Sequence, residues 1–103
     1  MNIIWSAQAR RDLRALEKFI ARDSAFYAHQ QVERIIEKVE AVATHPAAGH
    51  PVHEFPAANL REAHEGSHRI IYSFDDSTLS IVTIVHMKQL LDPQRVRGRG
   101  TKS

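Results

Sequence analysis

Histidine is the residue type with the most evident chemical potential in this 103-residue chain, which contains seven histidines and no cysteine. Three of them, His45, His50 and His53, lie in a proline-containing segment, and His64 and His68 flank a Gly-Ser pair. A structural zinc site needs four ligands in a fixed geometry, which paired cysteines or a His-Glu-x-x-His helix usually supply. The sequence contains neither pattern, and no helix is expected to align the loop histidines. We therefore expect no metal site and no bound cofactor.

Adjacent carboxylates occur once in a chemically suggestive position, at Asp75 and Asp76. They are followed by Ser77 and Thr78, and short side chains of this kind accept hydrogen bonds from the backbone of tight turns. We therefore interpret the pair as part of a turn and not as a catalytic acid and base.

The C-terminal end of the chain is basic. Residues 87–103 hold five basic side chains and one acidic side chain, whereas residues 1–86 hold nine basic and eleven acidic ones. A basic tail can bind nucleic acid or an acidic protein surface, and it can equally be a solvated end. We take Arg95, Arg97 and Arg99 as candidate target-binding residues. On this hypothesis, removing the tail after residue 91 lowers function more than stability.

The elements that must position these residues begin with a strand and two helices. Residues 2–5 form a short apolar start, and Ser6 offers an N-cap before apolar residues at a spacing of three to four. Ser24 offers a second N-cap, and the second helix should end near His45, because Pro46 disfavours helical geometry in the residue before it. The short connection predicts an antiparallel helical hairpin. The apolar positions are Ala9, Leu13, Leu16 and Ile20 in the first helix and Val32, Ile35, Ile36, Val39, Val42 and Ala43 in the second.

The second half of the chain has the pattern of a loop and a β-meander. Residues 46–58 contain prolines and a glycine without periodicity, which predicts a loop. Residues 60–65, 68–74 and 79–86 predict three antiparallel strands joined by tight turns. The last strand is apolar on both faces, so we expect a central strand that pairs with the first one.

These elements define an α+β fold in which an N-terminal strand and an antiparallel two-helix hairpin precede a three-stranded antiparallel meander. We expect a single domain over residues 1–91 and a basic, flexible tail over residues 92–103. The start of the chain lacks the apolar stretch of a signal peptide, and its most apolar run, residues 81–85, is far shorter than the roughly 20 residues that span a bilayer. We therefore expect a cytoplasmic location and no membrane partner.

A set of residues from both halves of the chain narrows the expected function. The set comprises Trp5, Ala9 with Asp12-Leu13, Leu60-Arg61-Glu62, Arg69-Ile70-Ile71-Tyr72 and Val85-His86. In order and spacing it resembles the ParE/RelE superfamily of bacterial toxin–antitoxin systems, and the resemblance covers residues 1–91. It implies a toxin that a co-expressed antitoxin neutralises by wrapping it with an extended or helical C-terminal segment. RelE-like members cut messenger RNA on the ribosome, whereas ParE-like members poison DNA gyrase without a known catalytic centre.

Metal-independent RNA cleavage requires a base for the 2′-hydroxyl, a cation beside the phosphate and an acid for the leaving oxygen. For a RelE-like activity, the resemblance implies that Arg69 binds the phosphate. Arg61 could support it, and His86 and Lys88 could transfer protons. RelE-like nucleases, however, carry a basic cluster on the sheet and a tyrosine or histidine near the C-terminus. This chain has no tyrosine after Tyr72 and no histidine after His86.

We therefore favour the ParE-like branch, which implies DNA gyrase as the target and a ParD-like or similar antitoxin as the second partner. Operator DNA would be reached only through the antitoxin. Two alternatives stay open, namely a RelE-like ribosome-dependent endoribonuclease and a decayed toxin that survives as a partner of its antitoxin.

The same residues also have structural interpretations. Arg69 can pair with Glu62 across the meander, because opposite charges on adjacent strands attract one another. His86 at a strand end can be a hydrogen-bonded structural histidine. The aromatic residues expected in the core are Trp5, Tyr72 and Phe74.

Overall fold

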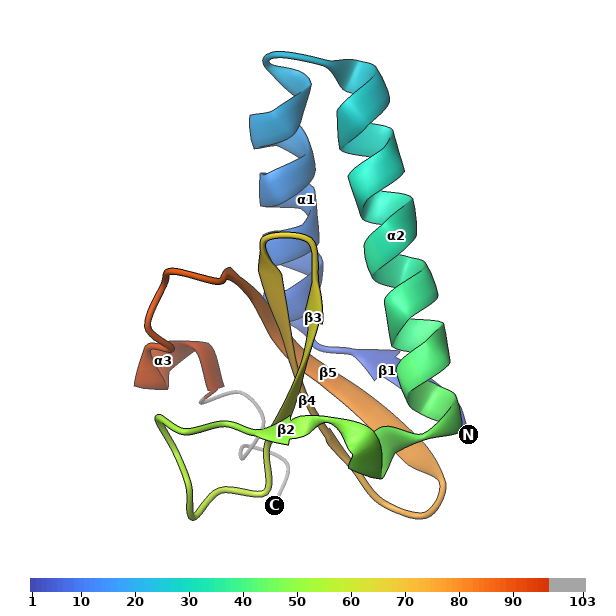
Figure 1. The fold of residues 1–103 in the computed structure, drawn as a ribbon, viewed down its shortest axis with the longest axis vertical. Helices are drawn as coiled ribbons and strands as arrows, with labels where there is room; N and C mark the ends of the chain where they lie inside the picture. The colour runs from blue at the N-terminus through green and yellow to red at the C-terminus, as the bar shows by residue number, and fades with distance from the viewer. Residues whose placement is uncertain (97–103) are drawn as a thin grey trace.

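The computed structural model describes residues 1–96, which form a helical hairpin on one mixed β-sheet (Figure 1). The sheet has five strands in the order β1-β5-β4-β3-β2. β1 is parallel to β5, and every other neighbouring pair is antiparallel. In chain order the elements are β1 (Asn2–Trp5), α1 (Ala7–Ala21), α2 (Ala25–Thr44), the 3-10 helix η1 (Pro46–Ala48), β2 (His50–Pro51), β3 (Arg61–Glu65), β4 (His68–Phe74), β5 (Thr78–His86) and α3 (Pro93–Val96).

Both long helices begin, and α2 ends, where side-chain chemistry predicts. The Ser6 hydroxyl accepts a hydrogen bond from the Ala9 N–H at 2.9 Å, and the Ser24 hydroxyl accepts one from the Tyr27 N–H at 3.1 Å. These bonds satisfy N–H groups that have no partner inside the helix. α2 ends at Thr44, two residues before Pro46. The predicted capped hairpin is therefore confirmed.

The helices cover one face of the sheet and enclose the larger core. Alternate residues of β4, Ile70 and Tyr72, point to this face, and both are almost completely buried. Trp5 and Phe74 pack against the same cluster, which confirms the predicted core aromatic residues. The other members of this cluster are Ala9, Ile35, Val39, Ala63, Leu79, Ile81 and Ile84.

The opposite face of the sheet carries a second, smaller core. Ile71 of β4 and Val82 and Val85 of β5 point to it, and the loop after β2 and the C-terminal segment cover them with Val52, Leu60 and Leu91. β5 is therefore apolar on both faces and lies between β1 and β4, as its sequence predicts. This second face of the sheet is closed by the loop after β2, by the segment after β5 and by the short helix α3.

Two details differ from the sequence-based expectation. The predicted loop over residues 46–58 contains η1 and the two-residue strand β2, because His50 and Pro51 pair with β3. Proline lacks an N–H donor, so an edge position suits it. The expected flexible tail also starts with ordered structure, since α3 forms and Val96 packs against the second core. No helix within residues 1–96 combines the length and the apolar character that crossing a bilayer requires.

Candidate functional site around Arg69

Arg69 lies on β4, on the face of the sheet opposite the helical hairpin, with only 6% of its side chain exposed. Its Nη1 and Nη2 donate to the two carboxylate oxygens of Glu54, each at 2.8 Å. Its Nε donates to Glu62 on β3. Nη1 also donates to the backbone carbonyl of Gln89 at 3.2 Å. One guanidinium group therefore connects the loop after β2, strand β3 and the segment after β5.

The electrostatics of this group are those of a closed ionic cluster. The hydrogen bonds from Arg69 lower the pKa of Glu54 to about 2, although burial of the carboxylate acts to raise this pKa. The hydrogen bond from the Leu91 N–H also lowers it. The two carboxylates in turn raise the pKa of Arg69, Glu54 contributing most. The predicted pairing of Arg69 with Glu62 is confirmed. Because four of its five N–H donors are used within the cluster and its side chain is buried, Arg69 is not presented to a phosphate in this arrangement.

The other residues proposed for RNA cleavage lie apart from this cluster. His86 is paired in register with His68, and Arg69 with Val85, so His86 points to the face opposite to Arg69. The His68 and His86 rings are 5.7 Å apart, and His86 Nδ1 accepts the Lys88 N–H at 3.1 Å. The pKa of His68 is lowered mainly by burial of its ring and to a smaller extent by the charge of His86. The Lys88 side chain is exposed.

Arg61 begins β3, next to the short edge strand. Its Nη1 donates to the Gly49 carbonyl at 2.7 Å. It therefore holds β2 against β3. The structure thus does not bring the four candidate nuclease residues together on one face of the sheet.

Of the three tail arginines proposed to bind the target, Arg95 is the one within the described residues. Its Nη1 donates to Asp12 of α1 at 2.7 Å. Asp12 is mostly buried and also accepts hydrogen bonds from the Thr83 hydroxyl and the Ile84 N–H. Arg95 thereby joins α3 to α1 and β5. Arg97 and Arg99 lie outside the described residues.

Sequence reasoning assigned no structural role to two carboxylates that organise this region, Asp12, which it named only for the family resemblance, and Glu54. Asp12 interrupts the apolar stripe of α1 next to Leu13, and a charged residue on a buried helix face is a signal that could have been used. Glu54 lies in an aperiodic loop and gives no comparable signal.

Among residues 1–96, no group of three or more His, Asp or Glu side chains is placed to bind a metal ion. The expected turn at Asp75 is confirmed, because its carboxylate accepts the Ser77 and Thr78 N–H groups.

A further surface feature lies at the tip of the helical hairpin, where α1 ends and α2 begins. Phe19, Phe26 and Tyr27 are each more than 60% exposed there. Phe26 and Tyr27 contact each other edge to face, with ring centroids 5.8 Å apart. Exposed clusters of large apolar side chains often mark protein interaction surfaces. The tip is therefore a candidate docking surface.

Two solved structures with the same fold come from toxin–antitoxin systems. A chain of the chromosomal ParDE toxin–antitoxin system from P. aeruginosa aligns with a TM-score of 0.73 and 20% identity, covering 85% of this chain and 97% of that one. A chain of the RelBE2 toxin–antitoxin complex from Mycobacterium tuberculosis aligns with a TM-score of 0.61 and 24% identity, covering 82% and 95%. At this level of identity the likeness establishes the fold. Among curated proteins, none matches the sequence significantly.

The sequence itself supplies the family. Residues 3–91 match the family described as the ParE toxin of the type II toxin–antitoxin system parDE. This range extends from β1 to Leu91 and includes the helical hairpin, the Arg69 cluster and the meander. The protein therefore belongs to the ParE toxin family of type II toxin–antitoxin systems.

Proposed function

We propose that this toxin inhibits bacterial growth by poisoning DNA gyrase and that a cognate ParD-like antitoxin neutralises it. The observation that carries the choice of target is the closed Arg69 cluster. Its guanidinium is buried and donates four hydrogen bonds to Glu54, Glu62 and a backbone carbonyl, and it faces away from His86. A phosphate-binding arginine beside a proton donor, which nuclease chemistry needs, is thus not assembled within residues 1–96. Inhibition by binding a protein target requires no such centre.

Two observations support the antitoxin part of the proposal. The fold is similar to chains from ParDE and RelBE2 toxin–antitoxin systems, and the toxin has exposed surface that could bind a partner. The exposed aromatic hairpin tip and the edges of the sheet suit a segment that folds on binding, either as a helix in a groove or as an added strand. Operator DNA would be bound through the antitoxin. The proposed site of action is the bacterial cytoplasm, where gyrase acts on DNA.

The test is to induce the toxin without antitoxin in a bacterial host and to follow DNA and protein synthesis with labelled precursors. We expect DNA synthesis to stop first, accompanied by induction of the DNA-damage response. Purified toxin should also increase the amount of cleaved DNA trapped by gyrase in vitro. Early arrest of translation with intact DNA synthesis would reject gyrase as the target. Growth unaffected by strong induction would indicate a decayed toxin.

A ribosome-dependent endoribonuclease remains the second candidate because of the two facing imidazoles of His68 and His86 near Lys88. The lowered pKa of His68 favours a neutral ring that can accept a proton. The variants His86→Ala and Lys88→Ala separate the two functions, because both side chains are exposed and their loss should leave the fold intact. Gyrase poisoning predicts that both variants keep their effect on DNA synthesis. Loss of messenger RNA cleavage in either variant would support the nuclease.

A further inference from the structure

The outer edge of β3 is only half covered by its neighbour. β2 pairs with Arg61 and Glu62, so within residues 1–96 no strand pairs with residues 63–65 on that side. The Val52 N–H donates to the Leu60 carbonyl at 3.4 Å, which shows that the Leu60 backbone faces β2. Backbone groups alternate in direction along a strand, so the N–H and C=O of His64 also face this edge. They are hydrogen-bonding groups of an open sheet edge.

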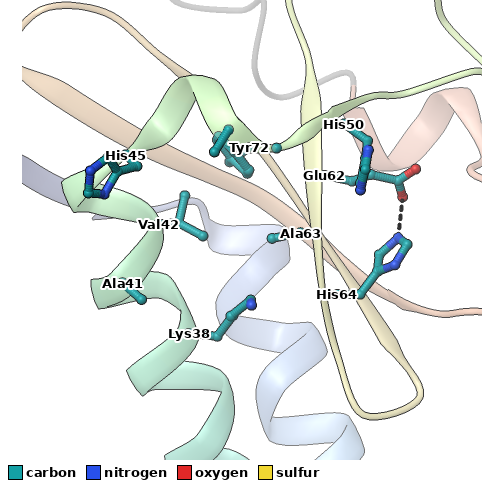
Figure 2. A pocket seen from close by; sticks show the side chains of 11 residues that line it. Lys38, Ala41, Val42, His45, His50, Glu62, Ala63, His64 and Tyr72 are labelled. Carbon is teal, nitrogen blue, oxygen red and sulfur yellow. Dashed lines mark ion pairs between the residues drawn. The ribbon is translucent and has the colours of Figure 1, made fainter.

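The chain itself turns away before it can cover this edge. Going backward from β2, Gly49 and η1 lead to α2, and the Tyr72 hydroxyl anchors this turn by donating to the Pro46 carbonyl at 2.7 Å. The result is a pocket of about 340 Å³ between α2, η1 and β3 (Figure 2). The open edge is therefore accompanied by a cavity that can receive side chains of an added segment.

Four of the eleven residues around the pocket carry basic side chains. They are Lys38 and His45 on the α2 side and His50 and His64 across β3 (Figure 2). The single carboxylate in the lining, Glu62, is bound to Arg69 and lies 3.5 Å from His64 Nε2. Among the ion pairs formed within residues 1–96, none includes Lys38. The remaining lining contains Ala41, Val42, Ala48 and Ala63, which gives the pocket an apolar part.

The opposite edge of the sheet, at β1, is less suitable. The N–H groups of Asn2 and Ser6 donate toward β5, so Ile3 and Trp5 face outward. The Trp5 carbonyl, however, already accepts a hydrogen bond from Arg10 Nη1 at 2.6 Å. One of the few acceptors of that edge is thus occupied by the toxin's own side chain.

We propose that the open edge of β3 at residues 63–65 binds an extended, acidic and partly apolar segment of the antitoxin as an added β-strand. Backbone hydrogen bonds to His64 provide the pairing, carboxylates of the segment lie beside Lys38 and His64, and apolar side chains enter the pocket. This inference rests on the proposed neutralisation of the toxin by an antitoxin. Complementary charge selects the partner, while main-chain pairing supplies much of the affinity.

The direct test is hydrogen exchange of individual amides, measured by NMR on the purified toxin with and without its co-encoded antitoxin. We expect the His64 amide to exchange rapidly in the free toxin and at least 100-fold more slowly in the complex, because a strand hydrogen bond protects it. The Ile3 amide, which faces outward at the β1 edge, is the internal control and should change little. Protection of Ile3 without protection of His64 would overturn the proposal. Protection of His64 that rises with concentration in the toxin alone would assign the edge to a second copy.

Charge is tested with a matched pair of helix variants. Lys38→Glu should weaken antitoxin binding at least tenfold, whereas Arg14→Glu on the exposed face of α1 should change it less than twofold. His64→Pro removes the outward N–H and should also weaken binding, with its thermal unfolding compared with the wild type to verify folding. Equal affinity of wild type and Lys38→Glu would reject the proposed acidic segment.

The outcomes also separate this inference from the function on which it rests. An antitoxin that binds and neutralises the toxin without protecting His64 rejects the inference and leaves the proposed function standing. A co-encoded antitoxin that forms no complex with the toxin, or a toxin without any effect on growth, rejects the proposed function itself.

Discussion

Arg69 shows how the role of a single residue depends on its burial and on its partners. In the sequence it is one basic side chain of a β-strand, with a phosphate or a carboxylate as its conceivable partner. In the structure its donors are distributed over Glu54, Glu62 and the Gln89 carbonyl. A guanidinium suits this role because its planar group of five N–H donors can engage a carboxylate with two parallel bonds. Its contribution is to hold three segments together.

We predict that Arg69→Ala lowers the free energy of unfolding by about 3–5 kcal/mol, because two largely buried carboxylates lose their shared cation. Urea unfolding at neutral pH, monitored by circular dichroism, measures this change. Arg14→Ala is the control, since the exposed Arg14 side chain should contribute within about 0.5 kcal/mol. A loss below 1 kcal/mol in Arg69→Ala would mean that the ionic cluster is not a structural element in solution.

The cluster also predicts a pH dependence of stability. The folded-state pKa of Glu54 is about 2, below its ordinary value of 4.5, chiefly because Arg69 donates to its carboxylate. A depressed pKa contributes stability that is present above the unfolded-state value and is lost as the pH falls toward the folded-state value. We therefore expect stability to fall between about pH 4.5 and pH 2, and Glu54→Gln to reduce this slope. Urea titrations at several pH values check it, and an unchanged slope would exclude Glu54 as its source.

At the scale of elements, Gly49, which joins η1 to β2, packs directly against Tyr72 of β4. A Cβ placed on Gly49 would lie 2.0 Å from the Tyr72 hydroxyl oxygen and 2.9 Å from the Glu62 carbonyl oxygen. Gly49 has an ordinary φ of −68°, so space and not backbone conformation requires glycine here. This close approach keeps η1 near the sheet and gives the pocket its border.

We predict that Gly49→Ala destabilises the protein by about 1–3 kcal/mol, the usual cost of overpacking. Tyr72→Phe removes the oxygen that the new methyl group would meet. The double variant should therefore lose less stability than the sum of the two single variants, which a double-mutant cycle of urea unfolding measures. Strict additivity would show that the Tyr72 hydroxyl is not the obstacle.

The C-terminal segment gives a second prediction at this scale. Truncation after residue 91 removes Arg95 and Val96 and leaves Asp12 without its cation, so it should cost about 1–3 kcal/mol of stability. Truncation after Val96 keeps these contacts and removes only residues 97–103. We expect the chain that ends at Val96 to be as stable as the full-length chain but less toxic on induction. Full toxicity of that variant would reject target binding by Arg97 and Arg99.

At the scale of the whole molecule, two small cores stabilise the described residues 1–96, and the chain contains no cysteine that could form a disulfide. Small domains have marginal stability, and a partner that binds only the folded state adds to it by mass action. We predict that antitoxin at a hundredfold excess over its Kd stabilises the toxin by about 2.7 kcal/mol and raises its Tm. Differential scanning calorimetry at several antitoxin concentrations measures the effect. A Tm independent of antitoxin concentration would contradict binding to the folded toxin.

Local chemistry was sufficient to predict most of the elements from the sequence. Ser6, Ser24 and Pro46 act through their immediate neighbours, so the limits of the two helices follow from the sequence alone. The same holds for the Asp75 turn and for the apolar pattern of β5. The ParE/RelE-like residues, spread from Trp5 to His86, indicated the family that the comparison over residues 3–91 established.

Tertiary structure alone decided which charged residues meet. Glu54 is fifteen residues from Arg69 and Asp12 is eighty-three residues from Arg95, and no periodicity relates these positions. Their pairing depends on how the loop and the C-terminal segment close over the second face of the sheet. The short strand β2 and the open edge at His64 were likewise invisible in the sequence, because strand pairing joins backbone groups whose contact depends on the path of the whole chain. Apolar spacing and capping are short-range properties of a sequence, whereas ionic clusters and sheet edges arise only when distant segments come together.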